Sequence, residues 1–261
     1  MSALAVVVQR RRAIWRGAVA DLRNRYAGSG LGLFWNLLHP LAQIATYTLV
    51  FGVLMPMPGR QGPGGFVLFL CAGILPWLSF AECVQRTTSA FITHATDLKK
   101  LAVPELVYWA QETVAVALNL AISFALFVPI ACWLGATFTW CWLCLPLLLG
   151  LWLVFAAGLG LALCTVNVFF RDVAQIVTVC LPLWMWLTPV VYEAERIPGA
   201  LHAWLALNPV HAFVEAVRSV LIAGQMPGPG PWFAMLTVSA LSLVAGYLVF
   251  SCLRTQIRDQ L

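Results

Sequence analysis

The residues of this chain that could do chemistry are few and scattered. Cys141 and Cys144 form a Cys-x-x-Cys spacing, and the four histidines are spread from His39 to His211. A zinc site needs about four ligands brought together, and in sequence no second cysteine pair or histidine lies close to this one. Ser29 stands between glycines but outside the Gly-x-Ser-x-Gly frame of a hydrolase nucleophile. These positions predict neither a metal centre nor a catalytic nucleophile.

Charged residues are missing where transport chemistry would place them. The middle of each long apolar stretch lacks Asp, Glu, Lys and Arg, whereas proton- and sodium-coupled carriers usually hold ionisable groups there. The phosphate-binding pattern Gly-x-x-x-x-Gly-Lys-Ser/Thr is also absent from the sequence, whose only lysines are Lys99 and Lys100. We therefore expect no ion coupling and no nucleotide site or other cofactor in this chain.

The composition places the chain in a membrane. Of its 261 residues 62% are hydrophobic and 10% are charged, whereas globular proteins have about 25% charged residues. The formal charge of +5 is carried by basic residues at the ends of apolar stretches, so it does not predict a nucleic-acid partner. The eight cysteines lie within or beside the same stretches, which is the usage of small hydrophobic residues.

The apolar stretches predict an all-α integral membrane protein that forms a single domain over residues 1–261. A helix needs about 20 apolar residues to cross a bilayer. We expect six transmembrane helices, of which the fifth is the weakest, at 36–55, 66–81, 113–134, 141–164, 174–191 and 232–253. The segment 192–231 holds a partly apolar helix near 209–223 that is too short to span, and we interpret it as re-entrant or periplasmic.

Residues 9–26 predict an amphipathic helix in the membrane interface. Trp15, Leu22 and Tyr26 recur at helical spacing, and arginines fill the opposite side. Such a helix places its arginines among lipid phosphates, although a simple basic anchor would have the same pattern. The glycines at 28, 30 and 32 then form a joint that leads into the first span.

Basic residues also predict the orientation. Positive residues gather on the cytoplasmic side of membrane proteins. With a cytoplasmic N-terminus, twelve of the fifteen lysines and arginines fall on that side, and only Arg60, Arg196 and Arg218 fall outside. We expect a multi-pass protein with both termini cytoplasmic.

Four motifs in the expected order resemble one family. They are Arg-Tyr-Ala-Gly-Ser-Gly-Leu-Gly-Leu-Phe-Trp-Asn-Leu-Leu-His-Pro at 25–40, Asn-Val-Phe-Phe-Arg-Asp-Val at 167–173, Thr-Pro-Val-Val-Tyr at 188–192, and Asn208-Pro209 followed by Glu215 and Arg218. Over nearly its whole length the chain resembles the permeases of ABC-2-type polysaccharide exporters. These permeases export O-antigen, capsule or teichoic acid across the bacterial inner membrane, and the first motif is most similar to those of the O-antigen and teichoic-acid permeases.

The resemblance implies partners and contact residues. The chain would form a homodimer and pair with two copies of an ATP-binding cassette subunit, which would hold ATP and Mg²⁺. The interfacial helix and the first cytoplasmic segment would receive the motion of that ATPase. The ATPase-coupling residues would be Thr96, Asp97, Leu98, Lys99 and Lys100. The interfacial entry residues would be Arg23, Arg25, Tyr26, Gly28 and Ser29.

A passage for a long glycan should be broad, rich in aromatic rings that stack on sugar C–H faces, and poor in charges. The spans that the resemblance places beside the channel carry seven candidate aromatics, namely Phe34, Trp35, Tyr47, Phe51, Trp184, Trp186 and Tyr192. Each could instead face lipid or anchor at the interface. Glu193, Arg196, Glu215 and Arg218 would lie at the exit, either as gating ion pairs or as solvated loop charges.

The leading hypothesis is a non-enzymatic transport subunit that forms the channel of an ATP-driven exporter of lipid-linked polysaccharide, as in lipopolysaccharide biosynthesis. The alternatives are a permease for capsular polysaccharide or a small lipophilic compound, or a membrane-embedded glycolipid-modifying enzyme. The enzyme is disfavoured because the sequence has no cluster of acidic or histidine residues at one membrane face.

Overall fold

A computed structural model describes residues 7–24, 35–47, 49–50, 63–100, 103–194, 199 and 202–260 of the chain. Every regular element among these residues is a helix. In chain order the helices are α2 (Arg11–Asn24), α3 (Trp35–Tyr47), α4 (Pro63–Thr93), α5 (Ala95–Lys100), α6 (Leu106–Trp133), the 3₁₀ helix η3 (Trp140–Cys144), α7 (Leu145–Phe169), α8 (Asp172–Leu187), α9 (His202–Leu207), α10 (Pro209–Leu221) and α11 (Pro229–Gln260).

Among the described residues, four helical segments are long and apolar enough to cross a membrane, at Gly65–Thr93, Leu106–Trp133, Trp140–Phe169 and Pro229–Arg258. The apolar helix Asp172–Leu187 is shorter. The all-helical membrane fold predicted from the sequence is therefore confirmed, with four long span candidates in the described part. The predicted first span at 36–55 is described only through α3 and residues 49–50, because residues 48 and 51–55 lie outside the described ranges.

Several helices extend beyond the predicted spans, most clearly α4 and α6. The second span was expected to end at 81, but α4 continues to Thr93. The third was expected to begin at 113, but α6 already begins at Leu106. Glu82, Arg86 and Glu112 lower the hydropathy at these ends. The helices nevertheless continue, because these charged side chains have polar partners within the bundle.

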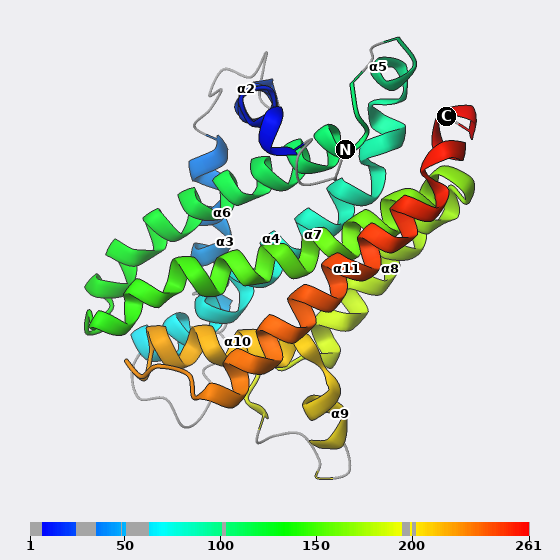
Figure 1. The fold of residues 1–261 in the computed structure, drawn as a ribbon. Coiled ribbons are helices and arrows are strands. Elements are labelled where there is room, and N and C mark those ends of the chain that lie inside the picture. Colours follow the sequence, from blue (N-terminus) through cyan, green and yellow to red (C-terminus); the bar gives the residue numbers. More distant parts are fainter. Residues whose placement is uncertain are drawn as a thin grey trace.

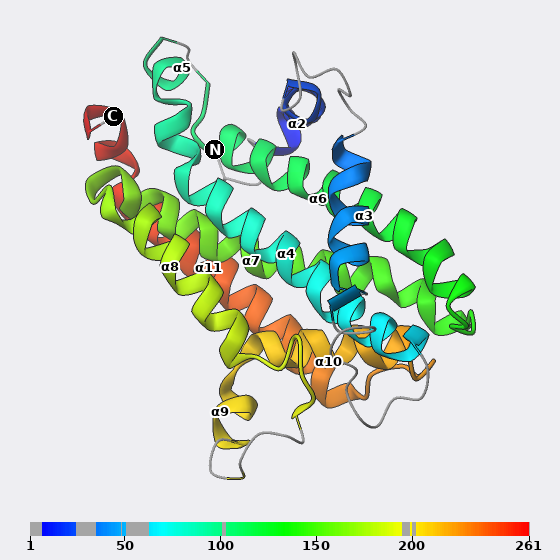
Figure 2. The same ribbon diagram turned by 180° about the vertical axis from the view of Figure 1, so that it is seen from behind.

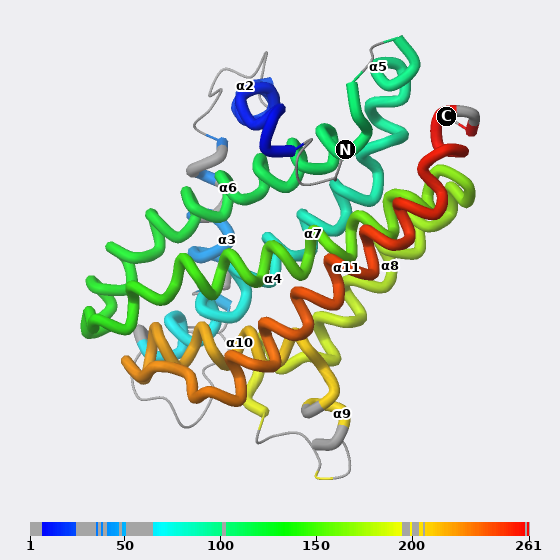
Figure 3. Tube along the Cα trace, in the orientation of Figure 1, coloured from blue at the N-terminus to red at the C-terminus, as the bar shows by residue number. Residues whose placement is uncertain are grey.

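The bundle has two distinct ends (Figures 1 and 2). At one end, called here the α5 end, lie α2, α5 and the last turns of α11. At the other, the α10 end, lie α9, α10 and the segments that join α8 to α11. The chain trace shows successive apolar helices running back and forth between these ends (Figure 3). The predicted ATPase-coupling residues, which form α5, therefore lie at the α5 end, and the predicted gate residues of α10 lie at the α10 end.

Small residues bring α7 and α11 into close contact. A Cβ at Gly158 would lie 2.5 Å from the backbone nitrogen of Leu243, so the two backbones leave no room for a side chain. The hydroxyls of Ser239 and Ser242 donate across the same interface to the carbonyls of Leu151 and Phe155, each at 2.9 Å. Small residues and hydroxyl groups of this kind are what hold helices together in a membrane.

A cluster of aromatic side chains fills the middle of the bundle. Phe80 of α4 lies 5.3 Å from Trp152 and 5.2 Å from Phe155, both on α7, measured between ring centroids. Phe213 of α10 stacks on Phe155 at 5.9 Å. The cluster joins α4, α7 and α10 into one close-packed core that also includes part of α8.

Candidate coupling site and Arg218 pocket

The residues predicted to meet the ATPase form a separate short helix at the α5 end. Helix α5 follows directly on α4, and the amide of Leu98 donates to the carbonyl of His94 at 2.9 Å. The Leu98 side chain is 1% exposed and packs in a cluster with Phe91 and Phe250. Its four neighbours Thr96, Asp97, Lys99 and Lys100 are exposed. The predicted coupling residues therefore divide into one anchor and a polar surface.

A series of polar contacts extends from α5 to α2. Arg86 of α4 donates through Nη2 to Asp21 Oδ2 of α2 at 2.6 Å, and the same nitrogen donates to Glu112 Oε2 of α6. The other oxygen of Glu112 lies 3.3 Å from His94 Nε2, and His94 Nδ1 lies 3.8 Å from Asp97 Oδ2. We call these five residues the Arg86 network. It connects α2, α4, α5 and α6.

His94 is held at the junction of α4 and α5. Its ring stacks on Tyr108 of α6 with centroids 4.5 Å apart and planes inclined by 20°. The stacking on Tyr108 and the contact to Glu112 together hold the His94 ring in place. The start of α5 is thus attached to α6 by a ring contact and a polar contact.

A second group of charges holds the segment that follows α5. The carboxylate of Glu105, 3% exposed, accepts from Arg258 Nε at 2.6 Å and lies 3.6 Å from Arg254 Nε. Arg258 also donates through Nη2 to the carbonyl of Val103 at 3.0 Å. The last turns of α11 therefore hold the chain between α5 and α6.

The N-terminal helix α2 packs on α6 through one face. Ile14, Ala18 and Leu22 are buried, and Ile14 belongs to a cluster with Val107 and Ala110 of α6. The arginines of α2 are exposed, including the predicted entry residue Arg23. Trp15, predicted to lie on the apolar side of the helix, is also exposed, at 54%. The other predicted entry residues, Arg25, Tyr26, Gly28 and Ser29, lie outside the described residues.

The predicted channel aromatics have different surroundings. Trp186 is 58% exposed and Trp35 is 41% exposed. Trp184 instead lies against the aromatic core, 5.6 Å from Phe80 between centroids. Tyr192 donates its hydroxyl to the carbonyl of Trp186 at 2.8 Å, and partial burial raises the pKa of Tyr192 above its ordinary value. Phe34 and Phe51, and the side chain of Tyr47, lie outside what the structure describes.

Two motifs that are distant in the sequence meet at the end of α8. Asn208 caps α10 by accepting from the amide of Val210 at 3.2 Å. Its amide nitrogen donates to the Thr188 hydroxyl at 2.8 Å, and its oxygen accepts from the Trp184 indole at 3.2 Å. The Thr-Pro and Asn-Pro motifs therefore form one joint between α8 and α10.

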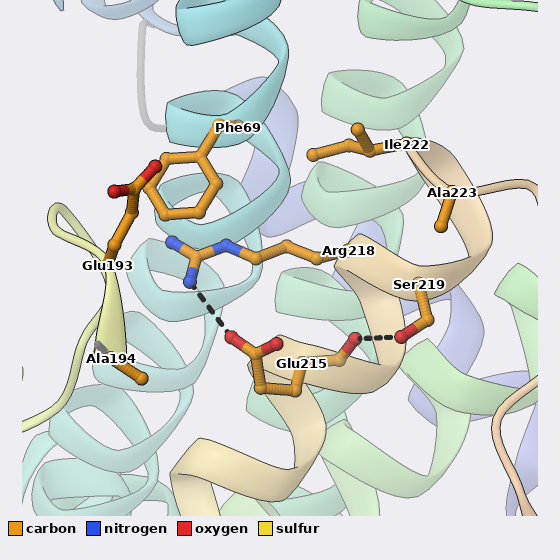
Figure 4. A pocket seen from close by; sticks show the side chains of 8 residues that line it. All are labelled: Phe69, Glu193, Ala194, Glu215, Arg218, Ser219, Ile222 and Ala223. Atoms are coloured by element: carbon orange, nitrogen blue, oxygen red, sulfur yellow. Dashed lines mark hydrogen bonds and ion pairs between the residues drawn. The ribbon is translucent and has the colours of Figure 1, made fainter. Parts of the chain in front are cut away.

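Arg218 of α10 lies at the centre of a pocket at the α10 end (Figure 4). Its side chain is 5% exposed, and it donates to the carbonyls of Pro189 at 2.8 Å and Val190 at 2.6 Å. It also contacts Glu215 Oε1 at 3.1 Å and lies 3.6 Å above the centre of the Phe69 ring.

The pocket has a volume of about 360 Å³ and is lined by Phe69, Glu193, Ala194, Glu215, Arg218, Ser219, Ile222 and Ala223. Three of the four predicted gate residues, Glu193, Glu215 and Arg218, thus meet there, while Arg196 lies outside the described residues. Gly73 permits the close approach of Arg218, because a Cβ there would lie 2.6 Å from Val190 O and 2.9 Å from Arg218 Nη2.

Sequence reasoning missed the Arg86 network and the buried carboxylate of Glu105. A signal was present, because charges that interrupt the ends of apolar helices usually have partners in the bundle. It did not identify those partners, which come from four different helices. Cys141 and Cys144 are free thiols, and Cys141 Sγ donates to the carbonyl of Gly224 at 3.1 Å.

The fold and these two regions define a multi-pass α-helical membrane protein with polar joints at both ends of an apolar bundle. The sequence model of the ABC-2 type transporter family matches residues 12–222. The chain belongs to this family, so it is a transport permease and not an enzyme, and permeases of this family carry no cofactor of their own.

Three relatives are similar over most of their length. The chain is 30% identical to the O-antigen export system permease protein RfbA of Myxococcus xanthus over 243 residues, 92% of each chain. It is 27% identical to the protein of that name from Klebsiella pneumoniae over 208 residues, 79% of this chain and 78% of the relative. It is 22% identical to the polysialic acid transport protein KpsM of Escherichia coli over 221 residues, 79% of this chain and 80% of the relative.

Proposed function

We propose that this chain is the channel-forming subunit of an ATP-driven exporter that moves a lipid-linked, O-antigen-like polysaccharide across the bacterial inner membrane. The observation that carries the proposal is the 30% identity to an O-antigen export permease over 92% of both chains. Export of capsular polysaccharide is the second candidate, supported by the weaker similarity to a polysialic acid transporter.

The proposed topology has six spans, with α3 and α8 as the short ones. In it the α5 end of the bundle lies in the cytoplasm and the α10 end lies outside. Most of the basic residues then lie at the cytoplasmic end, in agreement with the positive-inside rule. Both termini are cytoplasmic in this arrangement.

The ATPase docks on the exposed surface of α5. Thr96, Asp97, Lys99 and Lys100 present charges and a hydroxyl to the partner, while buried Leu98 fixes the helix to the bundle. Two permease copies pair with two ATPase subunits, which supply ATP and Mg²⁺. Movement at α5 and α2 then opens a path for the glycan.

The path is lined by aromatic rings and closed at the α10 end. Trp35 and Trp186 are 41% and 58% exposed, and the exposed face of an aromatic ring is a surface on which a sugar face can stack. Trp184 is a poorer candidate because its ring packs against the aromatic core and its indole bonds to Asn208. Arg218 holds the chain at Pro189 and Val190, directly after α8. The segment that follows closes the exit between transport cycles.

The first test removes the docking surface, including Asp97, which also lies 3.8 Å from His94. Thr96, Asp97, Lys99 and Lys100 are replaced by serine or glycine while Leu98 is kept, and co-purification with the ATPase encoded beside this gene is measured together with surface polysaccharide. We expect both to be lost with normal membrane insertion. The matched control is Arg171→Ser, which removes an exposed basic residue from the turn between α7 and α8. Docking and export that survive the replacement would refute the role of α5.

The second test concerns the glycan path. Trp35→Ala combined with Trp186→Ala should reduce surface polysaccharide and leave the complex with the ATPase intact. Trp140→Ala is the control, because this residue is 85% exposed but lies outside the predicted path. Undiminished export in the double variant would count against the lining role.

A further inference from the structure

We propose that Arg86 is a positioning residue that couples the movement of α5 to the interfacial helix α2. The observation is the continuous Arg86 network, which runs from Asp97 on α5 to Asp21 on α2. The proposal rests on the proposed function, because it takes α5 as the surface on which the ATPase docks.

Helix α5 has six residues, too few to be stable by itself. Its position is fixed by Leu98 and by His94 at its start. The His94 ring is stacked on Tyr108 and lies 3.3 Å from Glu112 Oε1. A push on α5 therefore displaces the ring that contacts Glu112.

Glu112 passes this displacement to Arg86. The His94 ring contacts one carboxylate oxygen of Glu112, and Arg86 Nη2 contacts the other. Asp21, the only acidic residue of α2, meets the same nitrogen at 2.6 Å. The buried residues of α2 are the apolar Ile14, Ala18 and Leu22, and Gly17 lies close against the Gln111 side chain of α6. Asp21 adds the charged contact that joins α2 to α4.

In the structure Arg86 Nη2 holds both carboxylates. The proposal requires a second arrangement, in which this nitrogen keeps Glu112 and releases Asp21 as α2 moves outward. Coupling between distant sites requires a physical element with two discrete states of this kind. An apolar residue at 86 would pack the helices but would not distinguish the two positions of α2.

The Glu105 group is the alternative route and supplies the control. Arg254 and Arg258 are 53% and 46% exposed at the side chain, and they connect the segment after α5 to α11 and not to α2. When Arg254 is replaced, the buried carboxylate of Glu105 still accepts from Arg258 at 2.6 Å. Arg254→Gln therefore removes one arginine from the same end of the bundle without touching the Arg86 network.

The experiment uses the full chain with its ATPase in a strain that lacks the native permease, and the host's own lipid-linked glycan is the probe. Surface polysaccharide and ATP hydrolysis by the purified complex are measured for Asp21→Asn, Arg86→Gln, Arg86→Lys, Glu112→Gln and Arg254→Gln. Hydrogen–deuterium exchange of the α2 backbone reports how firmly that helix is held.

We expect Arg86→Gln to co-purify and hydrolyse ATP, but to export about fivefold less glycan per ATP, the lower end of typical coupling between sites. Exchange in α2 should accelerate while α7 and α11 stay unchanged. Asp21→Asn should act in the same direction, and Arg86→Lys should recover part of the loss because it keeps the positive charge. Arg254→Gln should match the native ratio.

An unchanged ratio in Arg86→Gln, or an equal fall in Arg254→Gln, would overturn the proposal. If Arg86→Gln does not fold, Asp21→Asn decides, because it removes the negative charge that Arg86 meets on α2 and leaves Arg86 and Glu112 in place. A native ratio in Asp21→Asn would then overturn the proposal. Failure of the native chain to bind the ATPase or restore polysaccharide would be a different result, because it would refute the proposed function itself.

Discussion

Loss of the Arg218 side chain should strongly destabilise the α10 end. In Arg218→Met a side chain of similar length remains, but the carbonyls of Pro189 and Val190 lose their donor at a site where the side chain is 5% exposed. A hydrogen bond to a charged group contributes about 1.5–3 kcal/mol. Each buried carbonyl that loses its donor costs about 1–3 kcal/mol, so for two carbonyls we expect a loss of about 2–6 kcal/mol.

The loss should be visible in thermal unfolding of the purified permease. One kcal/mol corresponds to about 2–4 °C in Tm for a chain near this size, so the expected fall is roughly 10 °C. Arg218→Lys should also be destabilised, because a single ammonium does not reproduce the planar group that serves two carbonyls and lies on the Phe69 ring.

Glu215→Gln is the matched control for Arg218→Met. Glu215 is 46% exposed at the side chain and makes an ion pair with Arg218 three residues along the helix. Exposed pairs contribute about 0–1 kcal/mol, so this variant should shift Tm only slightly. A fall in Arg218→Met no larger than that in Glu215→Gln would refute the interpretation of Arg218 as the residue that holds the joint.

Three further substitutions test other contacts. Gly158→Ala should lower Tm, because its Cβ would meet the α11 backbone and overpacking costs about 1–3 kcal/mol. Its control Gly150→Ala, in open space on the same helix, should raise Tm slightly. Equal shifts in the two variants would contradict the close contact between α7 and α11. Leu98→Ala should cost about 2–5 kcal/mol if α5 unfolds with the bundle, and otherwise should accelerate proteolysis near α5 selectively. Asn208→Ala should lower the free energy of unfolding by about 1–2 kcal/mol, because α10 loses its N-cap, and the change is measured as a fall in Tm. An unchanged Tm would argue against the joint between α8 and α10.

The sequence predicts the class of fold well because composition and the length of apolar stretches are local properties. It underestimates α4 and α6, because Glu82, Arg86 and Glu112 resemble the end of a span when each is considered without its partners. Pairing between helices is a property of the folded bundle, and no spacing within one helix reveals it.

The same limit affects the candidate sites. The aromatic content of α8 predicts a path for sugars, but Trp184 and Trp186, two residues apart, face the core and the exterior respectively. For Glu215 and Arg218 the sequence leaves open whether they are an ion pair or solvated charges. The structure pairs them and buries the arginine under Phe69. Their role in gating stays a prediction.

The close packing of the bundle constrains where a glycan could pass. Phe80, Trp152, Phe155 and Phe213 fill the middle of the chain with ring contacts, so a polymer has no route through that core. The proposed path must therefore follow an outer face. Helix α8 presents a row of exposed apolar residues including Ile176, Leu183 and Trp186, which would face lipid unless covered. A second copy opposite such a face would cover these residues and enclose a path between the two chains.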